Sequence, residues 1–271
     1  MAKAMIAGLL AAGHPAGNIT VTEPQETTLA LLRTGFPGVR TSTDNAAAIF
    51  GSHVIVLATK PQVLKAVAEA LVAPLKTEST NNPLILSIAA GIRVADLARW
   101  LDYKTIVRVM PNTPALVSEG ASGLYASQSV SEKQKDLAFA VCASFSKLAY
   151  WLDKEQLLDV VTGTSGSGPA YFLYLCEAMV EAAVEQGMPR EIARGLVAQT
   201  CLGVGKMTLS QLDTEFSVLR RNVTSPKGTT EAGIKVFDDN NVKQHMKDCV
   251  VAATKRADEL GDILGSQVKF F

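Results

Sequence analysis

The sequence predicts an α/β domain followed by an all-α domain, and two observations carry this prediction. Over the first half of the chain, short apolar runs that suit strands buried on both faces alternate with helical segments. That alternation is typical of a parallel sheet covered by helices. From Lys154 onward the sequence reads as helical throughout. We therefore expect two domains in this chain of 271 residues, covering residues 1–153 and 154–271.

The elements of the first domain follow one another in regular order. The chain opens in a helix ending at Gly13, and its apolar start lacks the cleavage site of a signal peptide. A strand at 18–22 and a helix at 26–35 come next, and Asp44 opens a short helix. Later strands are expected at 53–58, 84–88, 106–109, 122–125 and 148–152, and the helices between them at 63–75, 94–101 and 132–145.

Composition narrows the possible partners. Lys plus Arg (26) equals Asp plus Glu (26), and basic runs interleaved with aromatic residues are lacking, so we expect no nucleic-acid or membrane partner. No apolar run is long enough to span a bilayer, and the 3 histidines lack metal-binding spacing, so no metal is expected. The 4 cysteines never form a Cys-x-x-Cys pair and lie in apolar segments. They predict reduced core residues in a cytoplasmic protein.

Three short polar loops follow the buried strands of the first domain. They are Thr59–Gln62, Ala89–Gly91 and Met110–Pro114. Because ligands bind beyond the carboxyl ends of parallel strands, we expect the three loops to share one binding edge. Lys60, taken alone, is also explained as a solvated loop charge.

The first domain resembles a dinucleotide-binding unit that lacks its beginning. Glu23 stands at the end of the second strand of such a unit, where an acidic residue contacts an adenosine ribose. A first strand and a Gly-x-Gly-x-x-Gly loop should precede the first helix, yet the chain starts inside that helix. Without its first strand the sheet would have two unpaired edges, so we expect a strand-forming segment and a Gly-rich loop encoded upstream of Met1.

The helices of the second domain are apolar on more than one face. The small-residue segment Thr164–Pro169 reads as a loop, and a long apolar helix then runs to Gly187. A second helix covers 192–207. Helices of this kind are typically buried between subunits, so we expect an obligate dimer or a larger assembly.

Residues 219–237 hold the strongest candidate for a substrate site. Ser225–Gly228 reads as a turn, in which Pro226 fixes φ and Gly228 is free to take a positive φ, and a helix opens at Thr229. The unpaired N–H groups at a helix start suit a carboxylate or a phosphate. On these residues alone a plainly capped surface helix is favoured, since Ser and Thr caps are common.

Five motifs in order resemble those of the pyrroline-5-carboxylate reductase family, which catalyses the last step of proline synthesis. They are ATKPQ at 58–62, SIAAG at 87–91, MPNTPALV at 110–117, SGSGPAYF at 165–172 and LRRNVTSPKGTTEAGIKVF at 219–237. The resemblance covers nearly the whole chain. It implies a Rossmann domain, a helical dimerisation domain, and reduction of 1-pyrroline-5-carboxylate to L-proline by NADPH or NADH. It also implies a cytoplasmic homodimer that in many members assembles further into a decamer.

The resemblance also assigns site residues. Together with Glu23, the residues that it places around the cofactor are Asn45, Ala58, Thr59, Lys60, Pro61, Ala89, Ala90 and Gly91, with Asn112 and Thr113 beside the nicotinamide. The residues that it places around the substrate are Ser225, Gly228, Thr229 and Thr230. We expect the substrate carboxylate on the backbone N–H groups of residues 228–230 and the Thr230 hydroxyl on the ring nitrogen, which makes Thr230 the catalytic candidate. A helix N-cap is the structural alternative for Thr230.

The chain departs from the family pattern at two places, and two alternatives stay open. Only Met1-Ala2 represents the family's Gly-rich loop, and Lys227 stands where the family commonly has Gly or Asn. Glu23 favours the ribose hydroxyls of NADH, whereas the family often uses NADPH, so both are expected. One alternative is another imine or β-hydroxyacid reductase on this architecture. The other is a non-catalytic homologue that dimerises through its helical domain.

Overall fold

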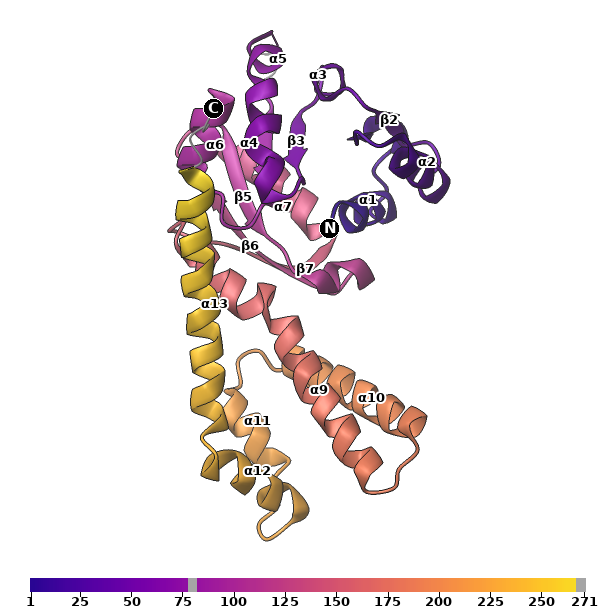
Figure 1. Cartoon of the computed structure of the whole chain (residues 1–271), viewed down its shortest axis with the longest axis vertical. Coiled ribbons are helices and arrows are strands. Elements are labelled where there is room, and N and C mark those ends of the chain that lie inside the picture. The colour runs from indigo at the N-terminus through magenta and orange to yellow at the C-terminus, as the bar shows by residue number, and fades with distance from the viewer. Residues whose placement is uncertain (78–81, 267–271) are drawn as a thin grey trace. The chain divides into compact units, whose positions relative to one another are not determined.

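A computed structural model (Figure 1) describes residues 1–77 and 82–266 of the chain. The chain divides into two compact units, one formed by Met1–Ser167 with the residues from Val251 onward, the other by Gly168–Val250. We call them the sheet unit and the helical unit. The domain boundary predicted between residues 153 and 154 rests on a change in composition, and it stays a prediction.

The sheet unit contains two sheets. In the smaller, β1 (Thr20–Thr22) pairs in parallel with β2 (Arg40–Ser42). The larger has the strand order β3-β4-β5-β6-β7, and its strands are β3 (Val54–Leu57), β4 (Leu84–Ser87), β5 (Ile106–Met110), β6 (Gly120–Ala126) and β7 (Ser146–Trp151). Within the described residues, β1 and β3 each pair with one strand only. The strand predicted upstream of Met1 stays a prediction.

The parallel order predicted from the alternating pattern holds for β3, β4 and β5 and then ends. Strand β6 runs antiparallel to β5, and β7 pairs in parallel with β6. The reason lies in the connection between β5 and β6, which holds only the short 3-10 helix η2 (Thr113–Val117). A parallel pair needs a crossover of a dozen or more residues, usually a helix.

Helices cover both faces of the larger sheet (Figure 1). Side chains of α4 (Pro61–Ala70), α5 (Val72–Thr77) and α6 (Val94–Leu101) share a core with Ile85. Those of α1 (Ala2–Ala11) and α7 (Glu132–Ala143) share another core with Leu84 and Leu86. Because successive strand residues point to opposite faces, this division of β4 places the two helix groups on opposite faces. The single helix predicted over 63–75 is instead broken at Leu71, since Pro74 has no N–H to continue it.

Helices α2 (Glu26–Gly35) and α3 (Asn45–Ala48) accompany the smaller sheet. Side chains of α1, α2 and β1 form a third core around Ile6 and Leu29. Helix α1 also lies close to the turn between α7 and β7, because Gly8 carries no side chain. A Cβ at Gly8 would collide with the carbonyl oxygen of Ser144.

The segment Thr164–Pro169, predicted to be a loop, is helical instead. Helix α8 (Leu157–Val161) continues into the π-helical turn η3 (Thr162–Gly166), which leads directly to α9. The hydroxyls of Thr162 and Ser165 donate to carbonyl oxygens one turn earlier, at Leu158 and Val161. Ser and Thr side chains within a helix often form such bonds, which satisfy their hydroxyls and commonly bend the helix.

The helical unit confirms the all-α prediction for the second half of the chain. Its helices are α9 (Gly168–Glu185), α10 (Arg190–Leu209), α11 (Phe216–Asn222), α12 (Thr229–Asp239) and the first part of α13 (Val242–Gly265). Helix α13 begins in the helical unit, and its residues from Val251 onward belong to the sheet unit. Within the described residues, no helix is long and apolar enough to cross a membrane.

Candidate active site

The residues predicted to line the cofactor fall into two places in the sheet unit. Three groups follow the adjacent parallel strands β3, β4 and β5 and therefore lie at one edge of the larger sheet. They are Ala58, Thr59, Lys60 and Pro61 after β3, Ala89, Ala90 and Gly91 after β4, and Asn112 and Thr113 after β5. Glu23 and Asn45 lie elsewhere, after β1 and at the start of α3, which packs beside β1.

Thr59 carries a polar atom that fits a bound ligand. Its Oγ1 is buried and, within the described residues, has no hydrogen-bond partner. A buried hydroxyl without a partner is costly, so such an atom at the carboxyl edge of a sheet marks a place where a ligand can supply the missing bond. Lys60 next to it is the N-cap residue of α4, and Pro61 is the first residue of that helix and has no N–H to donate.

The loops after β4 and β5 are held by local bonds. Ser87 Oγ accepts a hydrogen bond from the Ala89 N–H at 3.4 Å, and Gly91 has a φ of +76°, which favours glycine. Asn112 Oδ1 accepts from the Ala121 N–H at 2.9 Å, which ties the loop after β5 to strand β6. These bonds therefore define the local shape of both loops.

The acidic residue Glu23 follows β1 as predicted. Its N–H donates to the Ser42 carbonyl at 3.2 Å, and its Oε1 accepts from the Gln25 N–H at 3.2 Å. The nearby helix α3 is capped by Asp44, whose Oδ1 accepts from Ala46 N–H at 2.8 Å. Asn45 is the first residue of that helix.

The turn Ser225–Gly228 precedes α12, as predicted, but it differs in detail. The residue with positive φ is Lys227 (φ 59°), whereas Gly228 has φ −89° and is the N-cap residue of α12. The Gly228 N–H is also occupied, because it donates to the Ser225 carbonyl at 3.1 Å. To receive the substrate carboxylate, the Gly228 N–H would have to exchange this bond, so the expectation for it stays a prediction.

Thr229 and Thr230 are the first two residues of α12, and both are exposed. Their N–H groups belong to the first turn, whose donors have no partner within a helix, and no side chain caps that turn. Thr230 is thus not the N-cap, which removes the structural alternative considered for it. The Lys227 N–H donates to Glu231 Oε2 at 2.7 Å and stiffens the turn.

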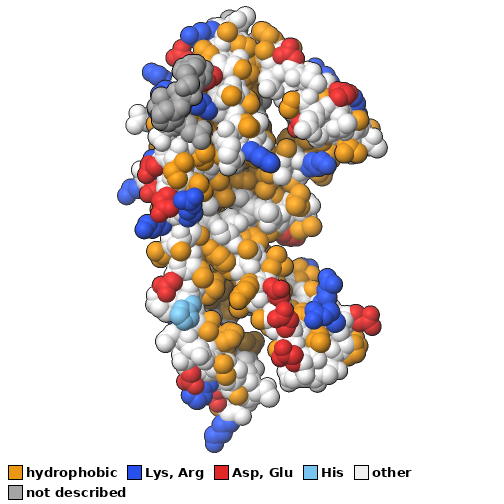
Figure 2. All heavy atoms as spheres, viewed as in Figure 1, with side chains coloured by type: hydrophobic (Ala, Val, Ile, Leu, Met, Phe, Trp, Pro, Cys, Tyr) orange, Lys and Arg blue, Asp and Glu red, His pale blue; other side chains and the backbone are white. Residues whose placement is uncertain are grey.

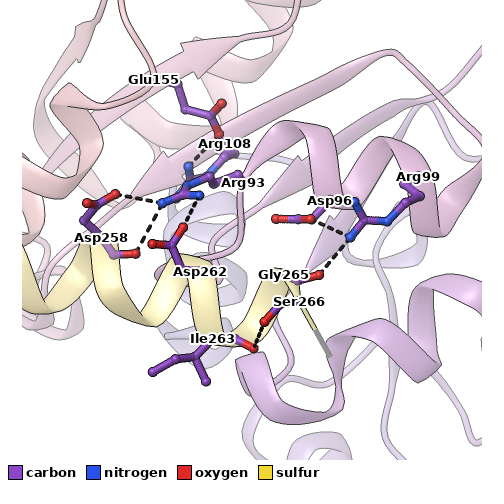
Figure 3. A network of polar contacts seen from close by, with 10 residues as sticks. All are labelled: Arg93, Asp96, Arg99, Arg108, Glu155, Asp258, Asp262, Ile263, Gly265 and Ser266. Atoms are coloured by element: carbon purple, nitrogen blue, oxygen red, sulfur yellow. Dashed lines mark hydrogen bonds and ion pairs between the residues drawn. The ribbon is translucent and has the colours of Figure 1, made fainter. Parts of the chain in front are cut away.

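Sequence reasoning missed a set of charged residues near the start of α6, which follows the loop after β4 (Figure 3). Arg108 in β5 donates to Glu155 Oε1 at 2.6 Å, and the same oxygen accepts from the Val94 N–H at 2.7 Å. Arg93 forms ion pairs with Asp258 and Asp262 of α13. The partners are up to 169 residues apart in the sequence, so no local pattern announces them.

The cysteines correct another expectation. All four are free thiols, but only Cys142 is buried within the chain. Burial raises the pKa of the Cys142 thiol to about 12, so this thiol stays protonated. Cys176 is half-buried, and Cys201 and Cys249 are exposed. Within the described residues, no group of three His, Cys, Asp or Glu could hold a metal ion.

The helical unit exposes many large apolar side chains, and Figure 2 shows hydrophobic side chains on its visible face. On α9 they include Phe172, Leu173 and Tyr174, of which the last is 73% exposed. Leu196 and Leu202 on α10 and Val236 on α12 are also exposed. Apolar surface of this extent marks a subunit interface.

A Rossmann-like sheet with polar loops at its carboxyl edge, joined to a helical unit with an exposed apolar surface, defines a two-domain nicotinamide-dependent oxidoreductase. Comparison with known proteins supports this class. Residues 1–91 match the family model "NADP oxidoreductase coenzyme F420-dependent", and residues 155–260 match "Pyrroline-5-carboxylate reductase dimerisation". The protein therefore has a nucleotide-binding domain and an oligomerisation domain.

Individual relatives then define the family. The chain is 44% identical over 266 residues to a pyrroline-5-carboxylate reductase of Pseudomonas aeruginosa, covering 98% of this chain and 95% of that one. Identity to the Vibrio alginolyticus enzyme of the same name is 40%, covering 96% and 94%. The chain belongs to the pyrroline-5-carboxylate reductase family.

Solved structures agree with this assignment. A pyrroline-5-carboxylate reductase from Coxiella burnetii superposes with a TM-score of 0.88 at 37% identity, covering 96% of this chain and 94% of that one. A Plasmodium falciparum pyrroline carboxylate reductase, solved with NADP bound, gives a TM-score of 0.82 at 26% identity with the same coverage. The fold class and the use of a nicotinamide cofactor predicted from the sequence are confirmed.

Proposed function

We propose that this protein reduces 1-pyrroline-5-carboxylate to L-proline with NADPH or NADH, the last step of proline biosynthesis. The observation that carries the proposal is that nearly the whole chain matches reductases of this name, across the sheet unit and the helical unit alike. The loops Ala58–Pro61, Ala89–Gly91 and Asn112–Thr113, gathered at one sheet edge, support the cofactor assignment.

The cofactor, when bound, supplies the hydride. Thr59 would then pair its buried hydroxyl with a polar atom of the ligand. Ala89, Ala90 and Gly91 would let the ligand approach the backbone after β4, and Asn112 and Thr113 would border the nicotinamide. Glu23 would accept hydrogen bonds from the ribose hydroxyls, and Asn45 would lie beside the same end.

The chain's own contribution to the reaction is binding, orientation and proton delivery. The N–H groups of Thr229 and Thr230, at the positive end of α12, would hold the substrate carboxylate, with Ser225 beside them. The Thr230 hydroxyl would donate a hydrogen bond to the ring nitrogen, and the proton that this nitrogen gains would come from water, directly or through that hydroxyl, as the adjacent carbon accepts the hydride.

We also propose that the protein is a cytoplasmic homodimer that assembles further into a decamer. The dimerisation-domain match and the exposed apolar side chains of α9 and α10 support association through the helical unit. Neither nucleic acid nor membrane is a proposed partner, since basic and acidic residues balance at 26 each.

A thermal-shift titration with NADPH and NADH tests the function. A ligand that binds only the native state must raise Tm, and we expect a rise with at least one of the two nucleotides. ADP-ribose, which lacks the nicotinamide ring, serves as a comparison. The absence of a shift with both nucleotides would favour a non-catalytic homologue.

A further inference from the structure

The loop after β4 is fastened to α13 by one arginine. Arg93 Nη1 lies 2.6 Å from Asp262 Oδ1, and Arg93 Nη2 lies 2.7 Å from Asp258 Oδ1 (Figure 3). Nη2 also donates to the Asp258 carbonyl oxygen at 3.3 Å. Because Asp258 and Asp262 are four residues apart, they lie on one face of the helix, and the planar guanidinium reaches both.

Next to these ion pairs, the backbone of the loop after β4 lies in close contact with the backbone of α13. Gly261 lies between the two aspartates, and a Cβ there would stand 2.9 Å from the Gly91 carbonyl oxygen and 3.2 Å from Arg93 Nε. A Cβ at Gly91 would meet the Gly261 nitrogen at 3.4 Å. Two facing glycines therefore allow the loop to lie against the helix.

The far end of the loop is held separately. Glu155 Oε1 accepts from the Val94 N–H, immediately after Arg93, and from Arg108 in β5. At the near end Ala89 donates to Ser87. The loop Ala89–Gly91 is thus held at its start by Ser87 and at its end by Glu155, and Arg93 connects it to α13.

We propose that Arg93 is a positioning residue that fixes the conformation of Ala89–Gly91 for cofactor binding, through Asp258 and Asp262. This rests on the proposed function, in which that loop lines NAD(P)H. The side chains of Arg93, Asp258 and Asp262 are 36%, 61% and 69% exposed, and exposed ion pairs contribute little to overall stability. We therefore expect these ion pairs to affect ligand affinity more than overall stability. A loop already held in its binding conformation needs less ordering when the ligand arrives.

The test compares Arg93→Gln with the control Arg99→Gln. Arg99 joins the same two helices, α6 and α13, through Asp96 at 2.6 Å and the Gly265 carbonyl at 2.8 Å, but does not border the loop. NADPH fluorescence titration gives Kd, and steady-state assays give KM for each substrate. We expect Arg93→Gln to raise Kd and KM for NADPH on the order of tenfold, with KM for 1-pyrroline-5-carboxylate unchanged, and Arg99→Gln to leave Kd unchanged.

Two more variants separate positioning from a general loss of fold. Arg93→Lys keeps the charge but not the two-carboxylate geometry, so its Kd should fall between wild type and Arg93→Gln. Gly261→Ala keeps all three charged residues but places a methyl group against the Gly91 carbonyl oxygen and the Arg93 side chain, and it should also raise Kd. Amide hydrogen exchange of residues 89–93 should become faster in Arg93→Gln.

Three results would overturn the proposal. The first is an unchanged NADPH Kd in Arg93→Gln when the wild type binds. The second is a fall in Tm far beyond that of Arg99→Gln, which would make Arg93 a structural residue. The third is a wild type that binds neither NADPH nor NADH, which would contradict the proposed function as well. The wild-type titration thus distinguishes failure of the proposed function from failure of the role of Arg93 alone.

Discussion

Arg108 in β5 and Glu155 form an ion pair at 2.6 Å whose side chains are only 6% and 20% exposed. Arg108 is a charged residue in a strand whose other members up to Val109 are buried and apolar. Its charge is tolerated there because Glu155 stands opposite it. The same carboxylate oxygen accepts from the Val94 N–H, so one acidic side chain connects β5 with the loop after β4.

Removing the carboxylate of this pair should destabilise the fold. Glu155→Ala leaves Arg108 buried without a counter-charge, and we expect the free energy of unfolding to fall by about 3 kcal/mol in urea titrations. The exposed pair Lys147–Glu119, with side chains 62% and 46% exposed, provides the control. Glu119→Ala should change stability by about 1 kcal/mol or less. Equal losses in the two variants would show that burial of the first pair has no energetic consequence.

The Thr230 hydroxyl should matter for catalysis and not for folding. Thr230→Ala is expected to lower kcat/KM for 1-pyrroline-5-carboxylate by about 10- to 100-fold, or ~1.4 to 2.8 kcal/mol of transition-state stabilisation. Thr230→Ser keeps the hydroxyl and should stay close to wild type. Because Gly228 is the N-cap of α12, Tm should be unchanged in both variants. Unaltered kinetics in Thr230→Ala would reject the role.

Glu23 should influence the choice of nicotinamide. A carboxylate at the end of β1 accepts hydrogen bonds from ribose hydroxyls and repels a 2′-phosphate. Glu23→Gln is therefore expected to raise the ratio of kcat/KM for NADPH to that for NADH by about tenfold. The control is Glu26→Gln, which removes an exposed carboxylate paired with Arg33. If both variants shift the ratio alike, the effect belongs to general surface charge.

Asp159 gives the fold a pH dependence. Burial raises the pKa of the Asp159 carboxyl above its ordinary value, with Asp258 and Glu155 adding to the rise and Arg108 and Arg93 opposing it. The folded state therefore holds this proton more tightly than the unfolded state. Stability from this group is complete below the unfolded pKa of about 3.9 and is lost as pH rises through the folded pKa.

Asp159→Asn should accordingly stabilise the protein at pH 7 and lose this advantage as the pH falls toward 4. The gain should be small, because the side chain is only half-buried and solvent screens its charge. Urea midpoints of wild type and variant across this pH range check the expectation. A variant less stable than wild type at pH 7 would mean that the charged form is favoured in the folded state.

The strands that carry the cofactor loops were predictable because most of their residues are apolar, with Ser87 and Arg108 as the polar exceptions. Sequence reasoning placed them at 53–58, 84–88 and 106–109, and the structure has β3, β4 and β5 there. Buried parallel strands need apolar side chains on both faces, which leaves a clear local pattern. The loops at their carboxyl ends followed from the same pattern.

Other features were not predictable from local patterns. Strand β6 runs antiparallel to β5 because the connection through η2 is too short for a parallel crossover. The positive φ of the turn before α12 falls at Lys227, although the neighbouring Gly228 would adopt a positive φ at lower cost. The ion pairs of Arg93 and Arg108 join residues 47 to 169 positions apart. Contacts between residues so far apart depend on tertiary packing, and they produce no local sequence pattern from which they could be predicted.

The most direct test of the proposed function is the reaction itself. Purified protein is incubated with 1-pyrroline-5-carboxylate and NADPH or NADH, and loss of the reduced nicotinamide is followed together with L-proline by mass spectrometry. We predict one L-proline formed for each nicotinamide oxidised, with the rate greatly reduced in Thr230→Ala. Binding of the nucleotide without formation of proline would contradict the assignment.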